Sequence, residues 1–222
     1  MRRRTTSAFS MAAAALLLAA CGGGTEKKSD EIAGANKGQS SASSSTSPAD
    51  DHVKRPNMPF PGDYKSVADW KAPTDSQQAA ALKDALNFSL AIRHGVIEQD
   101  ANDPAYLFYA APLGSAKEYA KDQIQKHIDG GWTLTGTERW SRPEVRVSTD
   151  DKRAAVSFCH DQSKLYGKEV KTKKVLRTKE SDKDYSVFEL VMERAPEENL
   201  WRAKSIEVKG EATQCKDVSQ QD

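Results

Sequence analysis

Apolar residues recur at helical spacing between residues 74 and 131, and this pattern predicts three helices. The first is long, begins at the capping-box sequence Thr74-Asp75-Ser76-Gln77, and includes Arg93 on its apolar face. The second is short and contains Tyr106–Tyr109. The third begins at another capping box, Ser115–Glu118, and the pair Gly130-Gly131 ends it.

The hydrophobic period changes to two at Trp132, which is typical of strands. The expected strands are residues 132–140, 144–147, 154–160 and 201–208, together with a hairpin formed by 170–178 and 185–193. Helices followed by a run of strands predict an α+β domain over residues 63–215, with the N-terminal helices packed on one face of an antiparallel sheet. Residues 216–222 are expected to form a C-terminal tail.

The first 20 residues have the organisation of an export signal. Three arginines at positions 2–4 precede an apolar stretch from Phe9 to Ala20. A helix of about 12 residues rises roughly 18 Å, whereas the hydrocarbon core of a membrane is about 30 Å thick. Residues 1–20 are therefore predicted to be a signal peptide and not a membrane-spanning helix.

The sequence Leu18-Ala19-Ala20-Cys21 resembles the lipobox of bacterial lipoproteins. The resemblance implies that the Cys21 thiol is acylated and that the preceding bond is cut. Two or more acyl chains, such as palmitate, would then hold the protein at the extracytoplasmic face of the cell membrane. An ordinary secretory signal with an incidental cysteine is the alternative.

The segment after the signal is poor in residues that can form a core. It contains Gly22–Gly24 and the low-complexity run Ser40–Pro48. Such composition predicts a disordered tether over residues 21–62, with prolines at 56, 59 and 61 stiffening its end.

The charge balance argues against nucleic acid as a partner. The whole chain has a formal charge of +1, from 33 basic and 32 acidic residues. Removing the three signal arginines leaves 30 basic against 32 acidic residues, a charge of −2. A near-neutral mature chain lacks the basic face that neutralises phosphates.

Two cysteines, Cys159 and Cys215, remain once Cys21 is assigned to lipidation. An even pair in an exported domain predicts a disulfide. A redox-active thiol is the alternative, but the sequence has no Cys-x-x-Cys motif.

No sequence motif indicates catalysis, a metal site or a cofactor. The histidines are scattered, and neither a nucleophile elbow nor a phosphate or dinucleotide loop is present. The prediction is therefore a domain without catalytic residues, metal or cofactor. The alternative is an enzymatic or small-molecule-binding domain that uses His160 and Asp161 with Tyr106 and Tyr109 for proton transfer.

Three segments resemble the nuclear-transport-factor-2-like fold of many secreted actinobacterial lipoproteins. They are the long helix from Thr74, the strand Ala155–Asp161 and the final strand Leu200–Ala203. The resemblance implies a curved, cone-like sheet around helices, with a cystatin-like sheet as the alternative. Such a cone offers an apolar pocket, and Trp132, Trp140, Tyr185 and Trp201 are candidates to line it or to fill the core.

A basic segment follows the third expected strand, on a predicted loop and edge strand. It contains Lys164, Lys168, Lys171, Lys173, Lys174, Arg177 and Lys179. Lysines on an edge strand guard against aggregation, or they contact anionic lipid headgroups or wall polymers. We take Lys171, Lys173 and Lys174 as the candidate anionic contact. The expected function is non-catalytic binding or scaffolding of a protein or polymer at the cell envelope.

Overall fold

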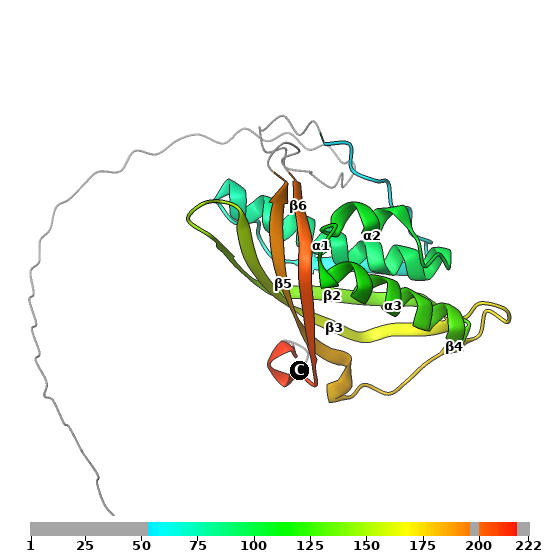
Figure 1. Ribbon diagram of the computed structural model, residues 1–222. Coiled ribbons are helices and arrows are strands. Elements are labelled where there is room, and N and C mark those ends of the chain that lie inside the picture. The colour runs from blue at the N-terminus through cyan, green and yellow to red at the C-terminus, as the bar shows by residue number, and fades with distance from the viewer. Residues whose placement is uncertain (1–52, 196–199, 217–222) are drawn as a thin grey trace, which may run out of the picture. The chain divides into compact units, whose positions relative to one another are not determined.

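Three helices lie on one face of a curved six-stranded sheet in the computed structural model, which describes residues 53–195 and 200–216 (Figure 1). The predicted α+β class is therefore confirmed. The signal peptide, Cys21 and most of the tether and the C-terminal tail lie outside the described residues. In the described part of the chain, no helix is both long enough and apolar enough to cross a membrane.

The helices are α1 (Ser76–Glu98), α2 (Pro104–Tyr109) and α3 (Ser115–Gly130). The cap of α1 is Asp75, one residue after the Thr74 of the predicted capping box, and its carboxylate accepts a hydrogen bond from the Gln78 N–H at 2.8 Å. Asp103 caps α2 by accepting a hydrogen bond from the Ala105 N–H at 2.7 Å.

The predicted capping box at Ser115 is absent, because the N-cap of α3 is Gly114 and no side chain caps this end. A β-carbon on Gly114 would lie 2.3 Å from the Lys204 carbonyl oxygen. Only glycine allows this backbone to approach so closely.

The strands of the sheet follow the order β1-β2-β3-β5-β6, and β4 pairs with β3. Their bounds are β1 Tyr64–Asp69, β2 Trp132–Val147, β3 Arg153–Glu169, β4 Val175–Leu176, β5 Tyr185–Ala195 and β6 Leu200–Gly210. Short 3-10 turns, η1 (Asp182–Asp184) and η2 (Thr213–Cys215), precede β5 and follow β6.

Three features of the sheet differ from the sequence prediction. Strand β1 was not predicted, and it pairs with β2 in parallel, so the sheet is mixed. The two strands expected at 132–140 and 144–147 are one strand with a register shift between Ser141 and Glu144. The expected hairpin of 170–178 with 185–193 is wrong, since both β4 and β5 pair with β3.

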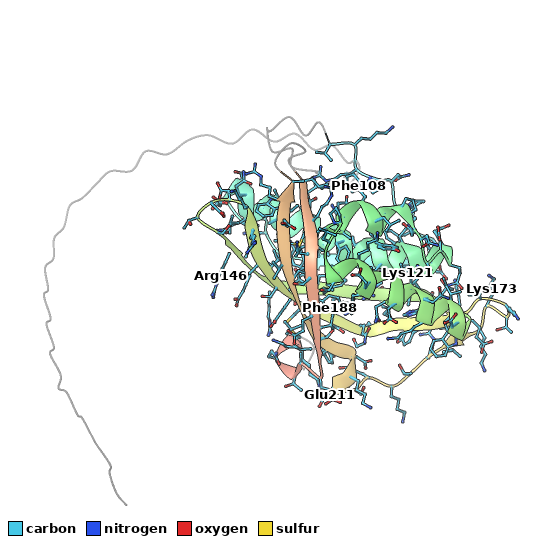
Figure 2. The ribbon with its side chains drawn as sticks, in the orientation of Figure 1. Phe108, Lys121, Arg146, Lys173, Phe188 and Glu211 are labelled. Atoms are coloured by element: carbon cyan, nitrogen blue, oxygen red, sulfur yellow. A yellow bond between two sulfur atoms is a disulfide. The ribbon has the colours of Figure 1, made fainter. Side chains whose placement is uncertain are left out.

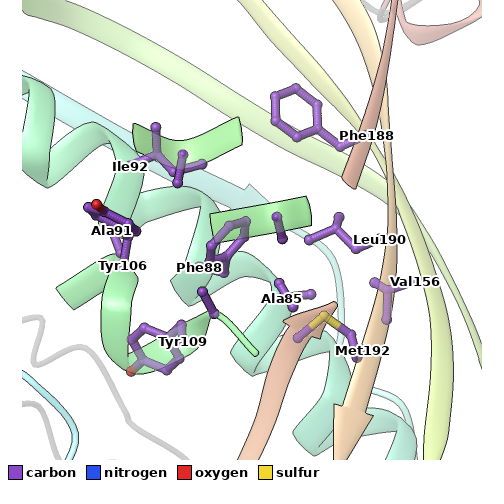
Figure 3. Packing of buried hydrophobic residues seen from close by; sticks show 14 of the residues in the cluster. Ala85, Phe88, Ala91, Ile92, Tyr106, Tyr109, Val156, Phe188, Leu190 and Met192 are labelled. Atoms are coloured by element: carbon purple, nitrogen blue, oxygen red, sulfur yellow. The ribbon is translucent and has the colours of Figure 1, made fainter. Parts of the chain in front are cut away.

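Large apolar side chains fill the space between the sheet and the helices (Figure 3). Phe88 and Ile92 of α1 pack toward Phe188, Leu190 and Met192 of β5, and all five are at least 96% buried. Full burial of one such side chain contributes about 1.5–3 kcal/mol.

The folded unit begins before the expected boundary at residue 63. Arg55 forms an ion pair with Asp84 of α1 at 3.1 Å, and the Asp84 carboxylate also accepts a hydrogen bond from the Trp201 N–H of β6 at 3.0 Å. Met58 and Phe60 pack against the core. Residues 53–62 are therefore held on the domain surface by a buried carboxylate.

The predicted disulfide between Cys159 and Cys215 is present, with a Cα–Cα distance of 5.3 Å. It joins β3 to η2, and together with Tyr185 and Ala212 it forms a second, smaller apolar cluster. Because side chains alternate along a strand, Cys159 lies on the opposite face of β3 from Phe158 and His160. The disulfide thus holds the end of the chain against the sheet face that the helices leave open.

Candidate functional site

A buried carboxylate, Glu138, lies at the centre of a polar cluster between the sheet and α1. Its Oε1 accepts a hydrogen bond from the Tyr64 hydroxyl at 2.6 Å, and its Oε2 lies 3.1 Å from Arg93 Nε and 2.8 Å from His160 Nε2. We call these four residues the Glu138 cluster. Its members come from β1, α1, β2 and β3, so the tertiary fold alone assembles it.

The Glu138 cluster contains an ionised carboxylate. Burial alone would raise the pKa of Glu138, but the charge of Arg93 and the hydrogen bonds from His160 and Tyr64 lower that pKa to about 2. Burial lowers the pKa of His160, although the contact with Glu138 opposes this change. Neutral His160 therefore donates its Nε2 hydrogen to the Glu138 carboxylate near neutral pH.

Aromatic rings enclose the cluster on the sheet side. Trp140 stacks on His160 with ring centroids 4.2 Å apart, and its indole N–H donates to the Ser66 hydroxyl at 2.9 Å. Phe188 meets His160 edge-on at 5.3 Å. Glu138 is completely buried, whereas 15% of the Arg93 side chain is exposed. Arg93 is therefore the member of the cluster that is most accessible to solvent.

The residues proposed for proton transfer do not converge on His160. Asp161 lies on the other face of β3, and its carboxylate accepts a hydrogen bond from the Ser163 N–H at 2.8 Å. The Tyr106 hydroxyl donates to the Ala101 carbonyl at 2.8 Å, and Tyr109 is buried in the core. Of the four candidates, the Glu138 cluster contains only His160.

The four aromatic residues considered for a pocket also lie apart. Trp140 and Trp201 are fully buried in the main core, and Tyr185 belongs to the disulfide cluster on the opposite sheet face. Trp132 is 46% exposed at the start of β2.

The sequence patterns did not predict Tyr64, Arg93 and Glu138 as site residues. For two of them, the sequence pattern did indicate burial. Arg93 is a charged residue on the apolar face of α1, and Glu138 shares the inward face of β2 with Trp140. A charge at an inward position requires a buried partner.

A hollow of about 560 Å³ lies on the sheet face that the helices leave uncovered. Its lining includes Glu144, Arg146, Ser157, Val191 and Glu207. These side chains point away from the Glu138 cluster, because they alternate with the inward residues of their strands. The hollow therefore gives no access to Glu138.

Lys171, Lys173 and Lys174 lie in the exposed connection between β3 and β4, and Figure 2 shows Lys173 at its far end. None of their ammonium groups takes part in an ion pair within residues 53–195 and 200–216. Over the same residues, no group of three His, Cys, Asp or Glu side chains is placed to hold a metal ion.

The comparisons with known proteins concern structure alone. No protein-family model and no curated protein matches the sequence. Aln2 from a Streptomyces species has a similar structure, with a TM-score of 0.43 and 10% identity over 64% of this chain and 96% of its own. A protein with a cystatin-like fold from Nostoc punctiforme has a TM-score of 0.36 and 9% identity over 58% of this chain and 89% of its own.

An NTF-2 like protein from Shewanella oneidensis has a TM-score of 0.36 and 13% identity over 57% of this chain and 96% of its own. With TM-scores below 0.5, these likenesses carry no argument about the chemistry of the Glu138 cluster.

Proposed function

We propose that this chain is a lipid-anchored extracytoplasmic protein whose domain acts without catalysis, by binding anionic envelope material through its surface. The observation that most directly supports the absence of catalysis is that the Glu138 cluster satisfies its own hydrogen bonds internally. Both carboxylate oxygens are engaged by Tyr64, Arg93 and His160, and Glu138 is completely buried. A substrate would have to displace one of these partners to reach Glu138, which costs several kcal/mol.

The contact surface in this proposal is the β3–β4 connection. Its three exposed lysines keep their charges available, whereas Lys168, Lys204, Lys209 and Lys216 each form an ion pair. A lysine near an anionic surface contributes about 1 kcal/mol, so three contribute about 3 kcal/mol, or roughly a hundredfold in affinity.

The anchor is tested by replacing the acylatable thiol. Cys21→Ser should abolish signal cleavage at this position and the recovery of lipidated protein, as measured by mass spectrometry of the membrane fraction. If the variant is still processed before residue 21 and retained with the same mass shift, Cys21 is not the anchor.

The binding surface is tested on residues 22–222, which lack the acylated cysteine. We expect this protein to bind both poly(glycerol phosphate) and phosphatidylglycerol vesicles at low ionic strength. The triple variant Lys171→Gln/Lys173→Gln/Lys174→Gln should bind each about a hundredfold more weakly. The control removes three exposed lysines elsewhere, Lys71, Lys117 and Lys121. Equal loss in both triple variants would refute the assignment of the surface.

A second candidate function is small-molecule binding or proton transfer at Glu138 and His160. The partial exposure of Arg93 favours it, since 15% of the side chain that contacts the Glu138 carboxylate is open to solvent. This function requires a ligand to compete for Arg93. A screen of small anions by thermal shift should then find ligands that stabilise the native protein and not Arg93→Lys; stabilisation of both alike would count against it.

A further inference from the structure

Trp132, the first residue of the long strand β2, is a large aromatic residue that is exposed to solvent. Its side chain is 46% exposed, while the other β2 tryptophan, Trp140, is completely buried. Trp132 follows Gly131, the left-handed residue that ends α3, and Gln99 donates to its carbonyl at 2.9 Å. The backbone at Trp132 is therefore fixed from two sides.

The β3–β4 connection is attached directly beside the backbone of Trp132. Trp132 is paired with Glu169 in the β2–β3 register, and the Val170 N–H donates to the Gly131 carbonyl at 2.9 Å. We call Trp132, Lys171, Lys173 and Lys174 the basic tip.

The acidic residue next to these lysines, Glu169, is held within the connection by a hydrogen bond and keeps its charge. The Glu169 carboxylate accepts a hydrogen bond from the Thr172 hydroxyl. The backbone of the connection is closed by the Lys173 N–H to Glu169 carbonyl bond and the Glu169 N–H to Lys174 carbonyl bond, both 2.9 Å long. The basic tip is thus an ordered turn that carries three lysines and whose backbone is joined to the backbone beside Trp132.

We propose that the basic tip docks on an anionic phospholipid bilayer, with the Trp132 ring entering the headgroup region and the three lysines binding lipid phosphates. This proposal rests on the proposed function and specifies its partner. Lysines alone would suit a soluble polyanion equally well. An adjacent exposed tryptophan favours a bilayer, because tryptophan rings partition to membrane interfaces and lysine stems lie along apolar surface while their charges stay in water.

The length of chain before the folded unit is consistent with this partner. Val53, the first described residue, follows Cys21 by 32 positions. The composition of these residues predicts a disordered tether, and a Gly/Ser-rich chain of that length has an r.m.s. span of roughly 30 Å. A tip on such a tether meets the bilayer at a high effective concentration, so a weak contact suffices for occupancy.

The test separates the ring from the charges. Residues 22–222 are sedimented with vesicles of equal parts phosphatidylglycerol and phosphatidylcholine, with pure phosphatidylcholine vesicles, and, separately, titrated with soluble poly(glycerol phosphate). We expect Trp132→Ala to weaken binding to the anionic vesicles about tenfold and to leave polymer binding unchanged. The reason is that the variant lacks the free energy gained when the half-exposed ring transfers into the headgroup region. The lysine triple variant should weaken both.

The matched control is Leu113→Ala, which removes an apolar side chain that is 90% exposed elsewhere on the surface and should change neither affinity. Near-ultraviolet circular dichroism verifies that each variant keeps its tertiary packing. If Trp132→Ala binds anionic vesicles as the parent does while the lysine variant does not, the bilayer inference is overturned and the proposed function stands. If neither variant loses affinity, both are overturned.

Discussion

Replacing Glu138 by glutamine should destabilise the fold strongly although it changes only one atom of the side chain. The pKa of Glu138 is about 2 in the folded protein, against an unperturbed value of 4.5. Since one pKa unit corresponds to about 1.4 kcal/mol, the ionised carboxylate contributes about 3 kcal/mol over its protonated form. Glutamine also leaves Arg93 without its buried counter-charge, so the expected loss is about 3–5 kcal/mol.

The assay is urea unfolding followed by circular dichroism, in which the midpoint of Glu138→Gln should fall by roughly 2 M. Glu144→Gln is the control, because Glu144 lies on the same strand and is exposed. A loss in Glu138→Gln no larger than in Glu144→Gln would refute the conclusion that the buried ion pair stabilises the fold.

The pH dependence provides a second check on the same residue. The pKa of Glu138 is lower in the folded than in the unfolded chain, so its contribution is complete above about pH 4.5 and is lost as the pH falls toward 2. The gap in stability between the parent and Glu138→Gln should therefore narrow over that range. A gap that stays constant from pH 6 to pH 3 would contradict the low pKa of Glu138.

Three further predictions concern stability. Cys215→Ser opens a loop whose ends are separated by 56 positions and should cost about 4 kcal/mol in the chain-entropy model, measured by chemical denaturation without reductant; a change below about 1 kcal/mol would argue against it. Arg55→Ala leaves the buried Asp84 carboxylate without its ion pair and should lower stability by about 3 kcal/mol, with Lys54→Ala as the neutral control. Gly114→Ala forces a β-carbon toward the Lys204 carbonyl and should lower the melting temperature by several degrees, whereas Gly62→Ala, which meets open space, should not.

The helices were predictable because their signals are local. Asp75 is a capping residue, and Gly131 takes the left-handed conformation that ends α3, with φ of 71°. Strand β1 was not predicted because it is a short, mixed-polarity edge strand whose partner, β2, comes about 70 residues later. The hairpin error had the same origin, since spacing along the chain does not reveal that β5 passes β4 to pair with β3.

For the Glu138 cluster, the sequence predicts the burial of Glu138 but not its partners. The period of two places Glu138 on the same face as Trp140, so its burial follows from the sequence. Its partners do not, because Tyr64, Arg93 and His160 lie 74, 45 and 22 positions away and meet it only after the sheet has curved around α1. The disulfide was predictable because only two cysteines, Cys159 and Cys215, remain once Cys21 is assigned to lipidation.

The Arg55–Asp84 ion pair has a mechanical consequence for a chain that is held from its N-terminal side. A pull on residue 53 reaches Arg55 before it reaches β1, and Asp84 passes that load to α1 and, through the Trp201 N–H, to β6. The Arg55–Asp84 ion pair, which links the N-terminal segment to α1 and β6, thus bears force before the parallel hydrogen bonds of the edge strand β1 do. While the ion pair is closed, it bears load before that load reaches β1. When it opens, the load passes next to Met58 and Phe60, which pack against the core, and only then to β1.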